Sequence, residues 1–461
     1  MTRRSPAFTE RRWKVNKPKH KTPRPKPLID QYGNIHYSAD ELARGGQGVV
    51  FRTKDADLAI KQPLDASGNP DGNINLRDRF QHIRLLPLPL RIPISLPLAI
   101  LRDEPGYVMR LLNDMSPFSN LELDGKTRGK LAKQELPEWL NQMPNEDFAL
   151  QLLHYANTGS TARRLFALSK CAATLARLHC SGIVYGDISS NNVFVGSESS
   201  KEVWLIDADN LCFETIKGVH AVYTPHYGAP EIVQGRDKSR PRTDCWAFAV
   251  MAFRSLTLCH PFIGKKVTDG DSDEGGWDAD PIADDMPADL DEQAYAGYLP
   301  FIDDEDDDCN AAQSGLPREL VATSMLRRLF QETFGPGRTQ PQRRPSMLFW
   351  AIEFARASDL SLNCPECKMS YFADDYTKCP YCDTSRPAFA YAKTENWKVL
   401  IPDGVSEFAL PHCLFNPYSP EHYDETAYEA EINFAKQTAK PVRGTRPFPD
   451  NLEFTFVEAT K

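Results

Sequence analysis

Val184-Tyr185-Gly186-Asp187-Ile188-Ser189-Ser190-Asn191-Asn192-Val193-Phe194 and the later run Leu205-Ile206-Asp207-Ala208-Asp209 are the most informative part of this chain. An acid, Asp187, and an amide, Asn192, lie five residues apart, and a second acid, Asp207, directly follows an apolar strand-like run. Asp187 can accept a proton from an incoming hydroxyl, while Asn192 and Asp207 can hold magnesium against the phosphates of a nucleotide. The two segments therefore predict the centre of a phosphotransferase.

The order of these groups resembles the catalytic loop and metal loop of protein kinases, which read H-R-D-x-x-x-x-N and D-F-G. Tyr185 stands in place of the histidine, Gly186 in place of the arginine, and Ala208-Asp209 in place of Phe-Gly. In many protein kinases that arginine meets a phosphate on the activation segment. Because Gly186 has no side chain, we expect that phosphorylation of this segment does not switch the protein on. Ser189 replaces the lysine found beside the transferred phosphate, which predicts slow transfer or a cation from elsewhere.

Two segments upstream resemble the nucleotide-binding lobe of the same family. The run from Ala43 to Phe51 is a glycine-rich hairpin, which allows backbone N–H groups to approach phosphate oxygens closely. Leu58-Ala59-Ile60-Lys61 resembles the V-A-I-K strand, whose lysine pairs with the phosphates. Its usual glutamate partner is missing from residues 62–103, and Asp78 is the nearest substitute on a helix predicted over residues 75–83. The resemblance implies these nucleotide-binding residues: Gly45, Gly46, Gly48, Val50, Lys61, Met109 and Leu111.

Downstream segments separate protein kinases from their relatives. Residues 222–231 resemble the T-P-x-Y-x-A-P-E end of a kinase activation segment, and residues 244–249 resemble the start of the central helix of the large lobe. The resemblance implies that Thr224 contacts Asp187 and that Arg344 pairs with Glu231. Small-molecule phosphotransferases share the G-D-x-x-x-x-N and I-D-x-D loops but usually lack these later segments. The resemblance to protein kinases covers about residues 38–357.

The chain of 461 residues is 41% apolar and 25% charged, which is typical of a globular protein of about two to three domains. Residues 1–27 hold ten Lys or Arg and one acid, whereas residues 269–308 hold seventeen Asp or Glu and no Lys or Arg. We predict a basic disordered arm over residues 1–37 and an acidic, solvated insert over residues 268–310. The arm leaves contact with nucleic acid open, but a solvated tail is favoured.

The basic N-terminus runs into Pro and Lys rather than an apolar segment, and prolines interrupt the most apolar stretch, residues 85–101. Neither a signal peptide nor a membrane span is therefore expected. We predict a cytoplasmic protein without membrane contact, and the cysteine usage agrees with a reducing compartment.

A close-set quartet of cysteines predicts a metal site. Cys364 and Cys367 form one C-x-x-C knuckle, and Cys379 and Cys382 form a second one after eleven intervening residues. Two such knuckles present four thiolates tetrahedrally, as in a zinc ribbon, and a site filled by four cysteines is structural rather than catalytic. Between the knuckles lie two lysines and three aromatic residues, but also Asp374 and Asp375, which slightly favours contact with a partner protein over nucleic acid. Beyond the ribbon, short apolar runs predict a β-rich tail.

These observations predict an α+β, bilobal protein kinase-like fold with a C-terminal zinc ribbon and a small β-rich tail. The predicted boundaries are 1–37 for the arm, 38–113 for the N-terminal lobe, 114–357 for the C-terminal lobe, 360–385 for the ribbon and 386–461 for the tail. The predicted activity is ATP- and magnesium-dependent transfer of the γ-phosphoryl group to a serine or threonine of a protein, with Zn²⁺ in the ribbon. A pseudokinase scaffold and a small-molecule phosphotransferase are the alternatives.

A closer resemblance rests on Gly315-Leu316-Pro317-Arg318-Glu319-Leu320 and Leu329-Phe330. These segments are similar to those of a bacterial group of zinc-ribbon kinases from tellurite-resistance-associated gene clusters. The resemblance implies two partners besides a protein substrate, namely a PP2C-type phosphatase and a von Willebrand A protein.

Overall fold

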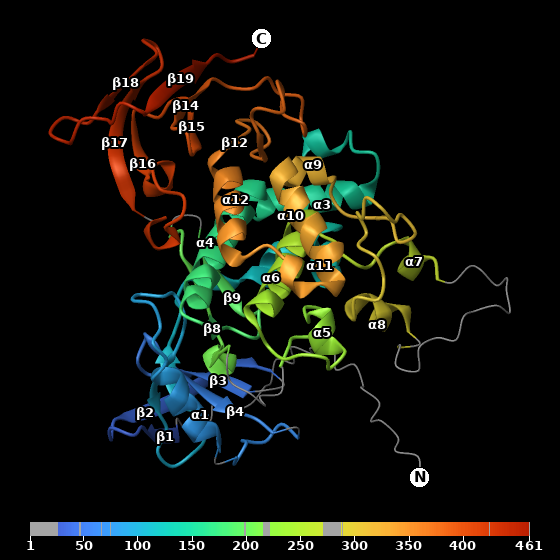
Figure 1. The fold of residues 1–461 in the computed structure, drawn as a ribbon, viewed down its shortest axis with the longest axis vertical. Coiled ribbons are helices and arrows are strands. Elements are labelled where there is room, and N and C mark those ends of the chain that lie inside the picture. The colour runs from blue at the N-terminus through green and yellow to red at the C-terminus, as the bar shows by residue number, and fades with distance from the viewer. Residues whose placement is uncertain are drawn as a thin grey trace. The chain divides into compact units, whose positions relative to one another are not determined.

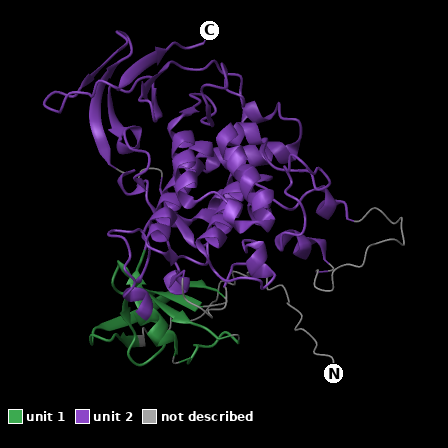
Figure 2. Cartoon of the chain, in the orientation of Figure 1, with its two compact units in different colours: residues 1–81, 97–111 green, residues 82–96, 112–461 purple. Residues whose placement is uncertain are grey.

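The computed structural model describes residues 26–45, 48–65, 67–73, 75–197, 200–214, 222–270, 287, 289–423 and 425–460. They form two compact units, which Figure 2 shows in different colours. Unit 1 holds the described residues up to Gln81 together with Pro97–Leu111, and unit 2 holds His82–Leu96 and the chain from Leu112 onward. Compared with the predicted lobe of residues 38–113, unit 1 starts earlier and lacks residues 82–96.

Unit 1 is an antiparallel sheet of six strands in the order β1-β2-β3-β4-β6-β5, accompanied by helix α1 (Figure 1). The elements are β1 (Lys26–Ile29), β2 (Ile35–Arg44), β3 (Gly48–Thr53), β4 (Leu58–Pro63), α1 (Asn75–Arg84), β5 (Pro97–Ile100) and β6 (Tyr107–Arg110). Leu28, Ile60 and Val108 belong to its buried core. Phe80 of α1 packs edge-on against Tyr107, with ring centroids 4.8 Å apart.

The prediction of an arm over residues 1–37 is wrong at its C-terminal end. Lys26–Ile29 forms β1 and pairs with β2, with Ile29 opposite Ile35. The side chain of Leu28 is buried, so a short apolar run after the basic residues is enough to join the sheet. Residues 1–25 lie outside the described part of the chain.

Unit 2 contains a helical core. Its helices are α2 (Gly125–Leu131), α3 (Glu146–Asn157), α4 (Ser160–Cys180), α5 (Pro230–Val233), α6 (Pro241–Thr257), α7 (Lys265–Thr268), α8 (Leu290–Tyr295), α9 (Arg318–Val321), α10 (Ser324–Phe334), α11 (Pro336–Thr339) and α12 (Met347–Asp359). Short 3₁₀ turns lie between them, including η1 (Phe118–Leu121) and η3 (Ala208–Asn210). The apolar residues of α4 recur at helical spacing, and Leu165, Leu168 and Leu175 are fully buried. Trp246 of α6 stacks on Phe262 and meets Phe334 edge-on as part of an aromatic cluster.

Two small sheets hold the loops of the predicted catalytic centre. One has the order β10-β9-β7, formed by Val203–Leu205, Val193–Gly196 and Met115–Pro117. The other pairs β11 (Cys212–Phe213) with β8 (Ile183–Val184), with Cys212 opposite Val184. Asp187 and Asn192 therefore lie on the connection between β8 and β9, and Asp207 lies on the connection between β10 and β11.

The acidic insert is only partly the solvated loop that its charge predicts. Within its described residues, α8 is followed by a segment in which Leu299, Phe301 and Ile302 are buried. Asn310 is fully buried and donates two hydrogen bonds, to the carbonyls of Phe262 and Pro300. Residues 305–309 are exposed, as expected of a charged run. The prediction is therefore wrong for residues 299–302, where apolar side chains between the acids enter the core, and residues 271–286 and 288 lie outside the described part.

The C-terminal region is rich in strands. Strands β12 (Ser361–Asn363) and β13 (Ser370–Phe372) form a hairpin around the first cysteine knuckle. Two three-stranded sheets follow, with orders β15-β14-β19 and β16-β17-β18. Their strands are β14 (Phe389–Lys393), β15 (Lys398–Pro402), β16 (Glu407–Pro411), β17 (Thr426–Asn433), β18 (Thr438–Pro441) and β19 (Glu453–Val457). The core of this region includes Ile352 and Ala355 of α12, so the tail packs on the helical core of unit 2 (Figure 1).

Across the described residues, no helix is long and apolar enough to cross a membrane.

Candidate active site

Backbone hydrogen bonds bring the two loops of the predicted catalytic centre side by side. The N–H of Ile206, the residue before Asp207, donates to the carbonyl of Asn192 at 2.9 Å. The side-chain amide of Asn192 donates to the carbonyl of Asp187 at 2.8 Å. The three residues that the sequence assigns to proton transfer and magnesium are thus linked through one short network.

Asp187 is 6% exposed, and both of its carboxylate oxygens have side-chain donors. Thr224 Oγ1 donates to Oδ1 at 2.7 Å, which confirms the predicted contact between these residues. Asn210 Nδ2 lies 3.5 Å from Oδ2. Sequence reasoning missed Asn210, because no kinase motif assigns a role to the residue after Ala208-Asp209.

Asp244, at the start of α6, anchors the backbone of the catalytic loop. Its carboxylate accepts hydrogen bonds from the N–H groups of Tyr185 (2.8 Å) and Gly186 (2.9 Å). The ring of His179, at the end of α4, lies 3.0 Å from the same carboxylate. Asp244 is 2% exposed, so the loop is fixed to a buried charge. His179 therefore supports the carboxylate that holds the catalytic loop.

Tyr185 links the catalytic loop to the metal loop. Its hydroxyl donates to the carbonyl of Ile206, immediately before Asp207. Burial, together with the nearby carboxylates of Asp207 and Asp187, raises the pKa of Tyr185 well above its usual value. The hydroxyl therefore stays protonated and keeps its role as a donor. Asp207 itself has φ 60° and ψ 57°, a left-handed conformation that is uncommon outside glycine and often found at functional positions.

The two serines of the catalytic loop differ in their surroundings. Ser190 donates to Glu122 and lies 2.6 Å from the hydroxyl of Tyr227, and Arg254 pairs with Glu122 at 2.8 Å. This network joins the catalytic loop to the end of the activation segment. No sequence motif predicts it, because its members come from four distant segments. By contrast, Ser189 is 1% exposed, and its hydroxyl has no hydrogen-bond partner among the described residues.

The end of the activation segment is fixed by a buried ion pair. Arg344 Nη1 and Nη2 donate to Glu231 Oε1 and Oε2 at 2.7 and 2.8 Å, which confirms the predicted pairing. The arginine side chain is 0% exposed and that of the glutamate 9%. Arg344 also donates to the carbonyl of Gly337 and lies over the ring of Trp246.

Unit 1 holds the predicted nucleotide-binding residues. A Cβ on Gly48 would lie 3.0 Å from the carbonyl oxygen of Gln62 and 3.1 Å from Lys61 Cε, so the strand needs a glycine where it approaches the lysine. Lys61 is 6% exposed and lies opposite Val50 across the β3–β4 pair. Gly45 donates its N–H to the carbonyl of Gly48, whereas Gly46 lies outside the described residues.

The remaining predicted residues of unit 1 receive less support. Asp78, the candidate partner of the lysine, is exposed on α1. Met109 is half-buried on β6, opposite Ala59. The N–H of Leu111 donates to the carbonyl of Asp57 at 2.8 Å, so this donor is already engaged and only the carbonyl and side chain of Leu111 remain for a nucleotide.

Comparison with known proteins agrees with this geometry. Residues 139–277 match the family model described as protein kinase domain, a range that includes the catalytic loop, the metal loop and Glu231. Fold and site therefore define a protein kinase-like region in this chain.

Individual kinases are similar to part of this chain. The serine/threonine-protein kinase kin-29 of Caenorhabditis briggsae is 30% identical over 114 residues, which are 24% of this chain and 14% of that protein. The human ribosomal protein S6 kinase alpha-3 is 35% identical over 104 residues, 22% of this chain and 14% of that protein. The serine/threonine-protein kinase pakB of Dictyostelium discoideum is 36% identical over 99 residues, 20% of this chain and 11% of that protein. The chain thus matches a small part of the length of each relative.

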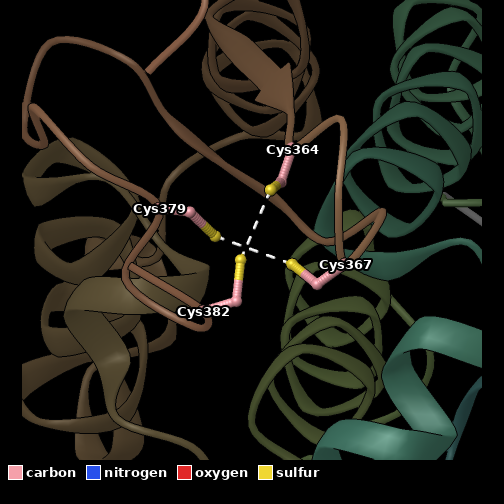
Figure 3. Close-up of side chains that lie close together, drawn as sticks. All are labelled: Cys364, Cys367, Cys379 and Cys382. Carbon is pink, nitrogen blue, oxygen red and sulfur yellow. Dashed lines mark hydrogen bonds between the residues drawn. The ribbon is translucent and has the colours of Figure 1, made fainter. Parts of the chain in front are cut away.

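A second candidate site is formed by the four cysteines of the predicted ribbon. Figure 3 shows Cys364, Cys367, Cys379 and Cys382 pointing to a common centre, and their sulfur atoms all lie within 4.8 Å of one another. Sγ–Sγ distances of 3.5 Å (Cys364–Cys382) and 3.6 Å (Cys367–Cys379) are close to the roughly 3.8 Å expected around a tetrahedral zinc with Zn–S bonds of about 2.3 Å. The hydrogen bond between Cys367 and Cys379 lowers the pKa of Cys379 and raises that of Cys367, so it favours a thiolate at Cys379 alone. The donor set fits a structural zinc.

The cysteine site is attached to the start of α4. This helix begins after Gly159, which provides no side-chain cap. Ser370, on β13 directly after the first knuckle, accepts a hydrogen bond from the N–H of Ala162 at 2.7 Å. Its own N–H donates to Ser160 Oγ at 2.8 Å. A residue 208 positions away in the sequence therefore caps the helix that leads to the catalytic loop.

Proposed function

We propose that this chain is an ATP- and magnesium-dependent serine/threonine protein kinase. The observation that carries the proposal is the environment of Asp187, a buried carboxylate that Thr224 and Asn210 orient and that is linked through Asn192 to the loop of Asp207. This is the arrangement that proton acceptance from a hydroxyl and metal binding require in phosphoryl transfer. The family match over residues 139–277 and the names of the aligned kinases support the same activity.

The residues of the site fit magnesium and nucleotide. The amide nitrogen of Asn192 is used by the carbonyl of Asp187, so its oxygen is left to face a cation beside the carboxylate of Asp207. Amide and carboxylate oxygens are the ligands that magnesium prefers. Bound magnesium would neutralise the phosphate charge, Lys61 would orient the phosphates, and Gly45, Gly46 and Gly48 would cover them. Asp187 would accept the proton of the attacking serine or threonine hydroxyl.

The expected turnover is slow. Ser189 occupies the position of a lysine that, in related kinases, lies beside the transferred phosphate. Its buried hydroxyl brings no positive charge. Preorganised charge around the transferred group usually supplies a large share of catalysis, so its loss should lower the rate without changing the reaction.

The proposal is tested by incubating the purified chain with γ-³²P-ATP and magnesium, together with protein acceptors such as casein, histone and myelin basic protein, and separately with small alcohols and aminoglycosides. We expect label in protein, little in small molecules, and almost none with Asp187→Asn. Asp306→Asn, in the exposed acidic run, is the matched control and should transfer as wild type does. Label confined to small molecules would support the small-molecule phosphotransferase, and no label with any acceptor would support the scaffold.

Further parts of the proposal do not come from the site around Asp187. They are a zinc ion in the four-cysteine site, a bacterial and cytoplasmic protein, and association with a PP2C-type phosphatase and a von Willebrand A protein. Purification of the tagged chain together with the two candidate partners, expressed in one host, tests the association. Recovery of neither partner in a stable complex would contradict it.

A further inference from the structure

The catalytic loop and the turn after the metal loop lie side by side. The β8–β11 pair is antiparallel, with Val184 opposite Cys212. Gly186 lies two residues after Val184, and Asn210 lies two residues before Cys212. The same antiparallel register therefore places Gly186 opposite Asn210. The close approach of these two residues is therefore built into the pairing of the strands.

Gly186 leaves little room beside Asn210. Its φ is 84°, a conformation that residues with a side chain rarely adopt. A Cβ at this position would lie 3.3 Å from the carbonyl oxygen and 3.6 Å from the Cβ of Asn210. The glycine that replaces the kinase arginine thus lets the turn of η3 pack directly on the catalytic loop.

Asn210 uses this proximity to reach the carboxylate of Asp187. Its Nδ2 lies 3.5 Å from Oδ2, whereas Thr224 donates to Oδ1 at 2.7 Å. Thr224 and Asn210 thus bring an uncharged donor to each oxygen, and the two donors come from opposite ends of the activation segment. The carboxylate is held in one orientation without a contribution from an arginine at position 186 or a phosphate.

We propose that Asn210 is a positioning residue for Asp187: together with Gly186 it takes over the coupling between catalytic loop and activation segment that an arginine and a phosphate provide in many kinases. The proposal rests on the proposed kinase activity, because only a reacting Asp187 needs this orientation. It accounts for a site that is organised without phosphorylation of the activation segment.

The first test is kinetic. Asn210→Ala removes the donor, and Asn210→Asp keeps the shape but places an oxygen against the carboxylate. The contact of 3.5 Å is longer than an ordinary hydrogen bond, so we expect kcat to fall several-fold in the alanine variant. The fall should be larger in the aspartate variant, whose charge repels the carboxylate of Asp187. The KM for ATP should stay unchanged, because Asn210 is not assigned to the nucleotide. Asn141→Asp, exposed after the turn 138–140, is the matched control and should behave as wild type.

The second test does not depend on activity. The ¹³C carboxyl signal of Asp187, assigned by its absence in Asp187→Asn, should move in both Asn210 variants and in Gly186→Ala, whose Cβ displaces Asn210. Unchanged kcat together with an unmoved signal would overturn the proposal. If the wild-type chain transferred no phosphate at all, the kinase assignment would fail, and the carboxyl signal alone would decide whether Asn210 positions Asp187.

Discussion

Replacing Glu231 by glutamine should be among the most destabilising single changes in unit 2. The carboxylate of Glu231 accepts two hydrogen bonds from Arg344, at 2.7 and 2.8 Å, and the arginine side chain is fully buried. Glutamine keeps one acceptor but turns an amide N–H₂ toward a guanidinium donor. It also leaves the charge of Arg344 without a counter-charge in the core.

The magnitude follows from these contacts. Each charge-assisted hydrogen bond contributes about 1.5–3 kcal/mol, so the loss of one costs about that much, and the unpaired charge of Arg344 adds to the loss. Breaking a buried ion pair from one side, which includes both effects, costs about 3–5 kcal/mol. We therefore expect Glu231→Gln to lower the free energy of unfolding by about 3–5 kcal/mol. The double variant Glu231→Gln/Arg344→Met should recover part of this loss, because no isolated charge remains.

Urea unfolding followed by tryptophan fluorescence measures the effect, since Trp246 lies directly against Arg344. The chain offers a matched control one residue away: Arg343 pairs with Glu332 at 2.8 Å, but the two side chains are 48% and 38% exposed. Glu332→Gln should therefore cost at most about 1 kcal/mol. If Glu231→Gln costs no more than Glu332→Gln, the reasoning from burial is refuted.

Three further predictions follow from other parts of unit 2. Elemental analysis of the purified chain should find one zinc per chain. The variant Cys364→Ser/Cys379→Ser should lose this zinc, and residues 360–385 should become accessible to protease. Full metal content in that variant would exclude the four-cysteine site. Ser370→Ala should cost about 1 kcal/mol and speed amide exchange at Ala162, whereas unchanged exchange would show that Ser370 is no effective cap. Burial raises the pKa of Asp359 to about 6, so the free energy of unfolding of the wild type falls as the pH rises from about 4 to 6 and this carboxyl group must lose its proton. Asp359→Asn has no such group, so its melting temperature should exceed that of the wild type by an amount that grows over this interval. A difference that does not depend on pH would contradict the assignment.

The parts of the site that the sequence predicted correctly are those that a short motif specifies. Thr224 donates a hydrogen bond to Asp187, and Arg344 forms an ion pair with Glu231, as the resemblance implies. Each of these residues belongs to a segment whose order of polar groups is tied to one chemical task, so the residue types alone indicate the contact. The apolar residues of α4 also recur at helical spacing, a pattern that depends on this segment alone and indicates a helix without knowledge of its neighbours.

The parts that could not be predicted depend on pairing between distant segments. Asn210 reaches Asp187 only because β8 and β11 set the register between their loops. Ser370 caps α4 across 208 positions of sequence. In the acidic insert, the seventeen acids outweighed a few apolar residues in any average of composition, yet Phe301 is 2% exposed. Composition reports the mean environment of a segment, whereas burial is decided residue by residue.

The surroundings of the four cysteines change the interpretation of the ribbon. A partner would be expected to contact the exposed side chains between the knuckles, but Tyr371 and Phe372 are 1% and 4% exposed and belong to the interior of this chain. Ser370 between them holds the first turn of α4, and at the far end of the same helix His179 contacts the carboxylate that anchors the catalytic loop. A metal bound by the cysteines would therefore stabilise the helix that carries the catalytic loop. Any partner of the ribbon must instead use its exposed charged side chains: Glu366, Lys368, Asp374, Asp375 and Lys378.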